Sequence, residues 1–218
     1  MEEETKAIET QGAPETETSE AIPEKKAAFF SRKNLKRNII LAVSLVVMAA
    51  IVAIVLSAMS PQSVAKRYCL AAWKNDPAQI ARCTAFDYKA VVINKYDDEE
   101  DFYEKVSDIY DEDIRSWKEY SKLMRESTRE EYEDEYGEYK ITAKVTRIKN
   151  ISERKLEEEV GTQLYEKLEE YGFDSDKITA SKIITVKVKL IGEDGRENET
   201  IDVYMAKING LWKVVTTK

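Results

Sequence analysis

The 218-residue chain contains no histidine, only two cysteines and seven glycines. Without histidine, neither a Ser-His-Asp triad nor a Cys-His pair can be built, and zinc cannot be bound through imidazole. Two cysteines are too few for a four-cysteine zinc site or an iron–sulfur cluster. Because these absences remove the commonest catalytic and metal-binding arrangements, we predict that the protein is not an enzyme and holds no cofactor and no metal.

Basic residues are outnumbered, and the net charge of −8 is unevenly divided. Residues 1–24 hold eight glutamates and one lysine, whereas residues 25–37 hold six basic residues and no acidic one. From residue 60 onward, 34 acidic residues stand against 27 basic ones. Since a net negative charge repels phosphate, we expect no nucleic-acid partner and no non-specific binding of anionic lipid in this part.

One long apolar run is present. Residues 39–59, from Ile39 to Met59, contain nothing more polar than serine. At about 1.5 Å per residue, a helix of this length crosses the roughly 30 Å hydrocarbon core of a bilayer. The run is longer than the apolar part of a cleaved signal peptide, so we predict an uncleaved signal anchor. The alternative is a buried core helix, which rarely reaches this length without a charge.

Basic residues flank this run unequally, with more of them before it than after it. The nearest of those before it are Arg32, Lys33, Lys36 and Arg37. The positive-inside rule therefore predicts a cytoplasmic N-terminus and residues 60–218 outside the plasma membrane, with the bilayer as a partner. Residues 1–38 have too few large apolar residues to fold, so we predict a disordered tail, which either docks a basic partner or is a solvated leader.

The spacing of small residues within the run would allow two spans to pack together. Ala49, Ala53 and Ser57 recur every four residues. Such a stripe brings helix backbones close in a membrane, so a homo-oligomer is one interpretation. The other is that these are ordinary small residues facing lipid.

Residues 60–218 suit one domain in which helices come first and strands follow. By periodicity and capping, we expect helices over 61–74, 77–83 and 153–171, and strands over 139–148, 184–190, 201–205 and 211–216. An acidic helical region is expected before residue 139, in which the residues at helical spacing are Phe102, Val106 and Ile109, and then Ile114, Trp117 and Met124. Residues 86–93 are expected as a strand or a buried loop. Thr128 with Glu131 makes a capping-box signature. This order predicts an α+β fold, in which N-terminal helices pack on a curved antiparallel sheet and the helices lie on one face of it.

Two short motifs carry a resemblance to a known family. The closing segment from Met205 to Val215, in which Asn209-Gly210 precedes Leu211-Trp212, is similar to the last hairpin of nuclear-transport-factor-2-like domains, also called cystatin-like. The segment from Ser63 to Asp76 is similar to their first helix. The resemblance covers roughly residues 61–218 and implies a cone-like fold. Enzymes of that superfamily tend to use polar groups inside the cone, often with histidine, which this chain lacks.

Two features outside these motifs each allow a chemical interpretation and a purely structural one. Cys69 and Cys83 are 14 residues apart on the first two expected helices, so they either form a disulfide or are two small buried residues. Residues 97–113 hold ten carboxylates. They lack the spacing and the glycine of a calcium loop, so a solvated helix face is favoured. Asp87 is the one carboxylate that we expect to be buried, between two aromatic residues.

Aromatic residues are the remaining candidates for ligand contact. They are Trp117, Tyr120, Tyr132 and Tyr136, followed by Tyr139. Such rings stack on a sugar or a peptide, or they cover the sheet as core.

From these observations we predict a membrane-anchored, extracytoplasmic binding domain of a bacterial protein, which takes a protein or small ligand and is not catalytic. The alternative is an assembly or scaffold subunit of an envelope-spanning secretion or conjugation machine. The bitopic assembly factor of type IV secretion systems has a similar layout of short tail, single span and outer cone domain. An enzyme would need a deep pocket that holds a carboxylate of raised pKa.

Overall fold

The computed structural model describes residue 44, residues 46–48 and residues 59–218. The predicted tail, Arg32, Lys33, Lys36 and Arg37, and almost all of the apolar run that begins at Ile39 lie outside the described residues. Met59, at the end of the run, lies in a turn and is exposed. No helix in the described part of the chain is both long and apolar enough to cross a bilayer. By its contacts the chain divides into Met1–Val47 and Met48–Lys218, and the second unit contains the folded domain.

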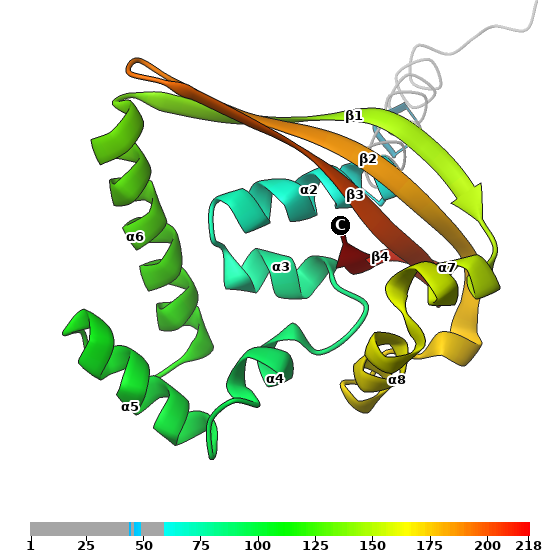
Figure 1. The fold of residues 1–218 in the computed structure, drawn as a ribbon, viewed down its shortest axis with the longest axis horizontal. Helices are drawn as coiled ribbons and strands as arrows, with labels where there is room; N and C mark the ends of the chain where they lie inside the picture. The colour runs from blue at the N-terminus through cyan, green and yellow to red at the C-terminus, as the bar shows by residue number, and fades with distance from the viewer. Residues whose placement is uncertain (1–43, 45, 49–58) are drawn as a thin grey trace, which may run out of the picture. The chain divides into compact units, whose positions relative to one another are not determined.

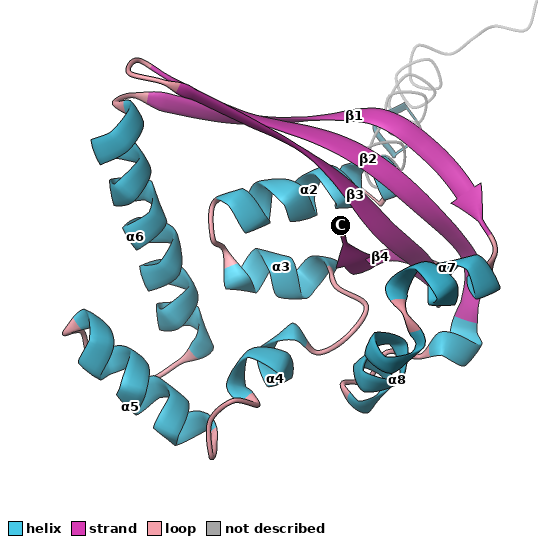
Figure 2. Cartoon of the chain, in the orientation of Figure 1, coloured by secondary structure: helices cyan, strands magenta, loops and turns pink. Residues whose placement is uncertain are grey.

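This unit has the predicted α+β class (Figure 1). Its helices are α2 (Pro61–Trp73), α3 (Pro77–Cys83), α4 (Tyr88–Ile93), α5 (Glu99–Tyr110), α6 (Trp117–Tyr136), α7 (Glu153–Val160), α8 (Thr162–Glu170) and the 3-10 turn η1 (Ser175–Lys177). Its strands are β1 (Tyr139–Ile151), β2 (Ile178–Gly192), β3 (Arg196–Ile208) and β4 (Leu211–Thr217). They form one antiparallel sheet in the order β1-β2-β3-β4 (Figure 2). Helices packed against a four-stranded antiparallel sheet are therefore confirmed.

The first two helices begin where the sequence places them. The Ser60 hydroxyl accepts a hydrogen bond from the Ser63 amide at 3.2 Å, and the Asp76 carboxylate accepts one from the Gln79 amide at 3.0 Å. Each cap precedes a proline, whose missing N–H costs nothing in the first turn. After α3, Thr84 forms a parallel bridge with Val214, which fastens the helical half of the domain to β4.

The main core lies between α2 and the sheet. Val64, Ala65 and Cys69 of α2 pack against alternating residues of β2 and β3 that are fully buried. The strand residues are Ile184, Val186, Val188, Val203 and Met205. Side chains fill this space, so α2 covers the sheet as ordinary core.

A second cluster lies on the other face of the sheet. Along β3, Val203 and Met205 point into the core under α2, whereas Tyr204 and Ala206 belong to a cluster with α7 and α8. Successive residues of a strand point to opposite faces. The prediction that the helices share one face is therefore wrong, because the inserted helices cover the opposite face at one end of the sheet.

Helices α4, α5 and α6 form a third cluster of their own, called here the α4–α6 lobe. The expectation of a strand or buried loop over residues 86–93 is wrong, because Asp87 caps α4 by accepting a hydrogen bond from the Ala90 amide at 3.0 Å. That role keeps Asp87 exposed, which corrects its expected burial. Thr128 lies inside α6 and starts no helix. The capping box is instead Ser116 with Glu119.

The helix expected over residues 153–171 is divided in two. Its predicted cap is confirmed, since the Ser152 hydroxyl accepts from the Lys155 amide at 3.2 Å. Gly161 then adopts φ 90°, a left-handed conformation, and separates α7 from α8. The break turns Leu164 outward and Tyr165 into the core, so the expected inward position of Leu164 is wrong.

Cys69 and Cys83 are free thiols in the structure, both buried in the core beside α2. Burial raises the pKa of Cys69 to about 12, and it also raises the pKa of Cys83. Since the thiolate is the reactive form, both groups are chemically protected while the domain is folded.

We therefore expect both native thiols to resist alkylation by iodoacetamide at pH 8, with peptide mass spectrometry as the readout. In denaturant without reductant, both should be alkylated completely. Ala72→Cys, at an exposed position of α2, is the control and should react in the folded protein. A protein that needs reductant before it reacts in denaturant would instead contain the disulfide.

Candidate functional site

The structure divides the candidate aromatic residues between two places. Trp117 and Tyr120 lie at the start of α6, inside the α4–α6 lobe. Tyr132 and Tyr136 lie near its end, where Tyr132 meets Tyr139 of β1. No single stacking surface contains all of them.

The first pair belongs to the packing of the lobe. The Tyr120 ring lies 4.9 Å from that of Phe102 and 5.2 Å from that of Trp117, in tilted or edge-on contacts typical of core. Burial raises the pKa of Tyr120 to about 12. The rings of Trp117 and Tyr120 thus stabilise the lobe, and Tyr120 also lines a hollow of about 490 Å³ in it.

The second pair lies at a corner where α6 turns into β1. The Tyr132 ring meets the rings of Tyr136 and Tyr139 edge-on, at 6.0 and 5.6 Å between centroids. The Tyr136 hydroxyl donates to the Glu197 carboxylate at 3.4 Å. Gly137 permits the turn with φ 67°, and its amide bonds back to the Glu133 carbonyl at 3.0 Å. Three tyrosines and a glycine turn therefore fix the corner.

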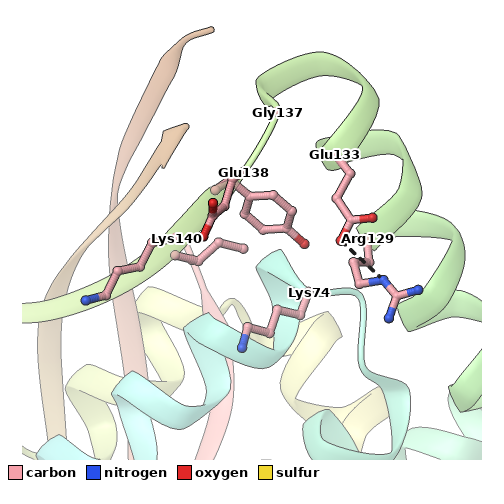
Figure 3. Close-up of a pocket in the computed structure, with 8 residues that line it drawn as sticks. Lys74, Arg129, Glu133, Gly137, Glu138 and Lys140 are labelled. Carbon is pink, nitrogen blue, oxygen red and sulfur yellow. Dashed lines mark ion pairs between the residues drawn. The ribbon is translucent and has the colours of Figure 1, made fainter. Parts of the chain in front are cut away.

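A hollow of about 620 Å³ opens at this corner (Figure 3). Its walls are the end of α2, the last turns of α6 and the first residues of β1. The lining residues are Lys74, Arg129, Glu133, Gly137, Glu138, Tyr139, Lys140 and Ile141. A smaller hollow of about 220 Å³ shares Lys74, Arg129 and Tyr139 with it. This volume lies in the range of small-ligand sites.

No family model, curated protein or solved structure matches this chain. The chemistry of the corner hollow is therefore argued from its own geometry.

Charges of both signs face the corner hollow. Arg129 pairs with Glu133 one turn along α6 at 3.5 Å, with both side chains about half exposed. Such an exposed pair contributes at most about 1 kcal/mol, so a ligand can replace it. Lys74 and Glu138 form no ion pair with any other described residue. Figure 3 shows Glu138 by the turn into β1 and Lys74 below it, at the end of α2.

Nothing in the sequence singled out these charged residues. The four-residue spacing of Arg125, Arg129 and Glu133 places them on one side of a helix, and this spacing is the sequence feature from which a shared charged surface could have been predicted. Lys74 reaches the hollow because α2 ends there, which depends on how α2 crosses the sheet.

The acidic stretch 97–113 forms local caps and surface pairs. Asp98 caps α5 by accepting from the Asp101 amide at 2.8 Å, and Lys105 contacts Asp101 at 2.7 Å. Lys89 and the Tyr103 hydroxyl donate to Glu99, and these bonds lower the pKa of Glu99. Among the described residues no group of three or more potential ligands could hold a metal ion.

Where the pKa of a carboxyl group among the described residues is clearly shifted, it is lowered. The pKa values of Glu99, Asp101, Glu119 and Glu159 are lowered, each mainly by hydrogen bonds that the carboxylate accepts. A general acid at neutral pH needs the opposite shift. The arrangement of the corner hollow is suited to binding charged groups.

Proposed function

We propose that residues 60–218 are a non-catalytic binding domain of nuclear-transport-factor-2-like type. The apolar run 39–59 would anchor it in the plasma membrane, with the N-terminus in the cytoplasm and the domain outside. The order of elements and the closing hairpin support the family. The length of the run and the basic residues before it support the topology.

The corner hollow carries the proposal of binding. It presents one ammonium group, Lys74, and one carboxylate, Glu138, that have no ion-pair partner among the described residues. The Arg129–Glu133 pair, on the α6 wall of the same hollow, is exposed and exchangeable. Tyr139 adds an aromatic wall. A ligand that fits these groups has a carboxylate, an ammonium and some apolar surface, which describes a short peptide with free ends.

The test is a set of tripeptides that differ only at their ends, assayed by thermal shift and calorimetry on the full chain in detergent micelles. We expect the peptide with free ends to bind, and either N-acetylation or C-terminal amidation to weaken binding at least about tenfold, the usual effect of losing one charged hydrogen bond. Lys74→Gln should abolish the effect of amidation, and Glu138→Gln the effect of acetylation.

Lys122→Gln, on α6 and 65% exposed, is the matched control and should change neither effect. Equal binding of free and capped peptides, or unchanged discrimination in both variants, would exclude the corner hollow as this site.

A second candidate function is the assembly subunit, and one observation favours it. Ile109 of α5 is 72% exposed beside a hollow of about 490 Å³ in the α4–α6 lobe. Val92, Tyr96 and Val106 are among the apolar residues that line this hollow. An exposed apolar side chain next to an apolar hollow is typical of a contact between proteins.

A further inference from the structure

The uncovered part of the sheet carries a concentration of positive charge that the net charge of the domain conceals. At the end of the sheet that α7 and α8 leave uncovered, six basic side chains share one face, called here the basic face. They are Lys140, Lys144 and Arg147 of β1, Lys187 and Lys189 of β2, and Arg196 of β3. None forms an ion pair with another described residue.

Strand register places these residues together. Lys144 is directly opposite Lys187, Thr142 is opposite Lys189, and Ile191 lies between Lys140 and Arg196. Alternate residues of β1, such as Ile141, point to the other face, beneath which α2 packs. Lys140 borders the corner hollow, but Figure 3 shows its ammonium group directed away from Arg129 and Glu133. The basic face is thus the side of the sheet opposite α2, at the end that α7 and α8 leave uncovered.

Acidic residues are scarce on this surface. On the same face of β3, the residues opposite Lys189 and Lys187 are Asn198 and Thr200. Asp202 follows, where its carboxylate accepts a hydrogen bond from the Thr185 hydroxyl at 2.6 Å. Glu193 and Asp194 lie in the turn between β2 and β3, at the end of the face, near Gly137.

Protection of a sheet edge does not account for the pattern. Lysines on an edge strand discourage pairing with other chains, and β1 is an edge. Lys187 and Lys189 lie on β2, however, which is paired on both sides. Lys144 opposite Lys187 is also a like-charge pair, which is unfavourable for the sheet itself. A retained unfavourable pair is expected where a surface serves binding.

We propose that the basic face lies on the anionic phospholipid head groups of the membrane that anchors the chain. The inference rests on the proposed anchor. The apolar run ends at Met59 and Ser60 already caps α2, so no linker separates the expected span from the folded domain. The charge of the face complements a phosphate surface, to which each nearby basic residue adds affinity. Ile191, 55% exposed among these bases, adds an apolar contact suited to the head-group region.

The experiment compares the full chain in nanodiscs of phosphatidylcholine with the full chain in nanodiscs of equal parts phosphatidylcholine and phosphatidylglycerol. Acetylation rates of single lysines are read by mass spectrometry. We expect Lys144, Lys187 and Lys189 to react at least about fivefold more slowly in the anionic discs, with Lys122 unchanged. Salt at about 1 M should remove the difference, because the screening length falls to about 3 Å.

Variants separate this surface from a general charge effect. Lys144→Gln with Lys187→Gln should reduce the protection of Lys189 to less than about twofold. The double variant is expected to fold, since it removes a like-charge pair. Lys118→Gln with Lys122→Gln, the same charge change on exposed positions of α6, should leave the protection intact.

Two outcomes would overturn the proposal. One is equal acetylation in both kinds of disc. The other is that phosphatidylglycerol gives no protection, whereas inorganic polyphosphate added to pure phosphatidylcholine discs does. That result would assign the basic face to a soluble polyanion. A chain that fails to enter either disc would refute the anchor. The same acetylation comparison with free vesicles of the two compositions would then decide the basic face by itself.

Discussion

Phe102→Ala should destabilise the α4–α6 lobe by about 4 kcal/mol, the usual cost of deleting a fully buried aromatic side chain. Phe102 is 2% exposed, and its ring lies within 5.1 Å of the rings of Tyr96, Tyr103 and Tyr120. The cavity left by alanine would be lined by rings from three segments of the chain, which cannot all move inward together. We expect the melting temperature to fall by roughly 10 °C.

Hydrogen exchange gives the sharper readout of this variant. The buried cluster of the lobe contains only residues of α4–α6 and their connections, so we expect its amides to exchange more than a hundredfold faster. Amides of β2 should change much less. Phe102→Leu keeps most of the volume and should cost about 1 kcal/mol. Equal acceleration throughout the domain would show that the lobe does not open separately.

Much of the fold follows from local rules that act within a few residues. Ser60, Asp76 and Ser152 cap the helices that the sequence assigns to them. The alternation of Ile184 to Leu190 gives a strand with one fully buried face. Asn209, at φ 50°, turns β3 into β4 as an Asn-Gly pair predicts. In each case the signal and the structure it specifies occupy the same short segment.

The errors arise where distant contacts decide. Residues 90–93 are mostly β-branched, which favours a strand, yet Val92 and Ile93 pack against the α5–α6 cluster as a helix capped by Asp87. Leucines and a valine at four-residue spacing favour one long helix over 153–171. The break at Gly161 lets Tyr165 reach Phe173, with rings 5.0 Å apart. In both places, tertiary packing overrides the secondary structure that the local sequence favours.

The sites depend still more on register and crossing angles. The alternation in β1 and β2 predicts that lysines share a face within each strand. That Lys144 meets Lys187 depends on the pairing of two strands about 40 residues apart, which local spacing does not encode. Lys74 and Glu138 line the same hollow only because α2 ends near the corner of α6 and β1. The net charge likewise sums acidic and basic residues that the fold places on different surfaces, so it does not predict the basic face.

Gly192→Ala should cost about 3 kcal/mol, because two backbones approach too closely at this position for any side chain. An alanine Cβ would lie 2.3 Å from the Tyr136 carbonyl oxygen and 2.6 Å from the Tyr136 Cβ. The oxygen cannot simply move away, since it accepts a hydrogen bond from the Asp194 amide at 3.2 Å. The substitution must therefore separate the end of α6 from the turn between β2 and β3.

The resulting displacement would move Gly137 and Glu138, so the variant should also weaken tripeptide binding in the corner hollow. Calorimetric melting should show a loss of roughly 10 °C. Gly210→Asn is the matched control: its φ of 82° suits asparagine, no atom lies within 4 Å of the added Cβ, and we expect less than about 1 kcal/mol. A Gly192→Ala protein as stable as the control would contradict the close contact, since no side-chain rotation can relieve a clash with the carbonyl group and the Cβ of Tyr136.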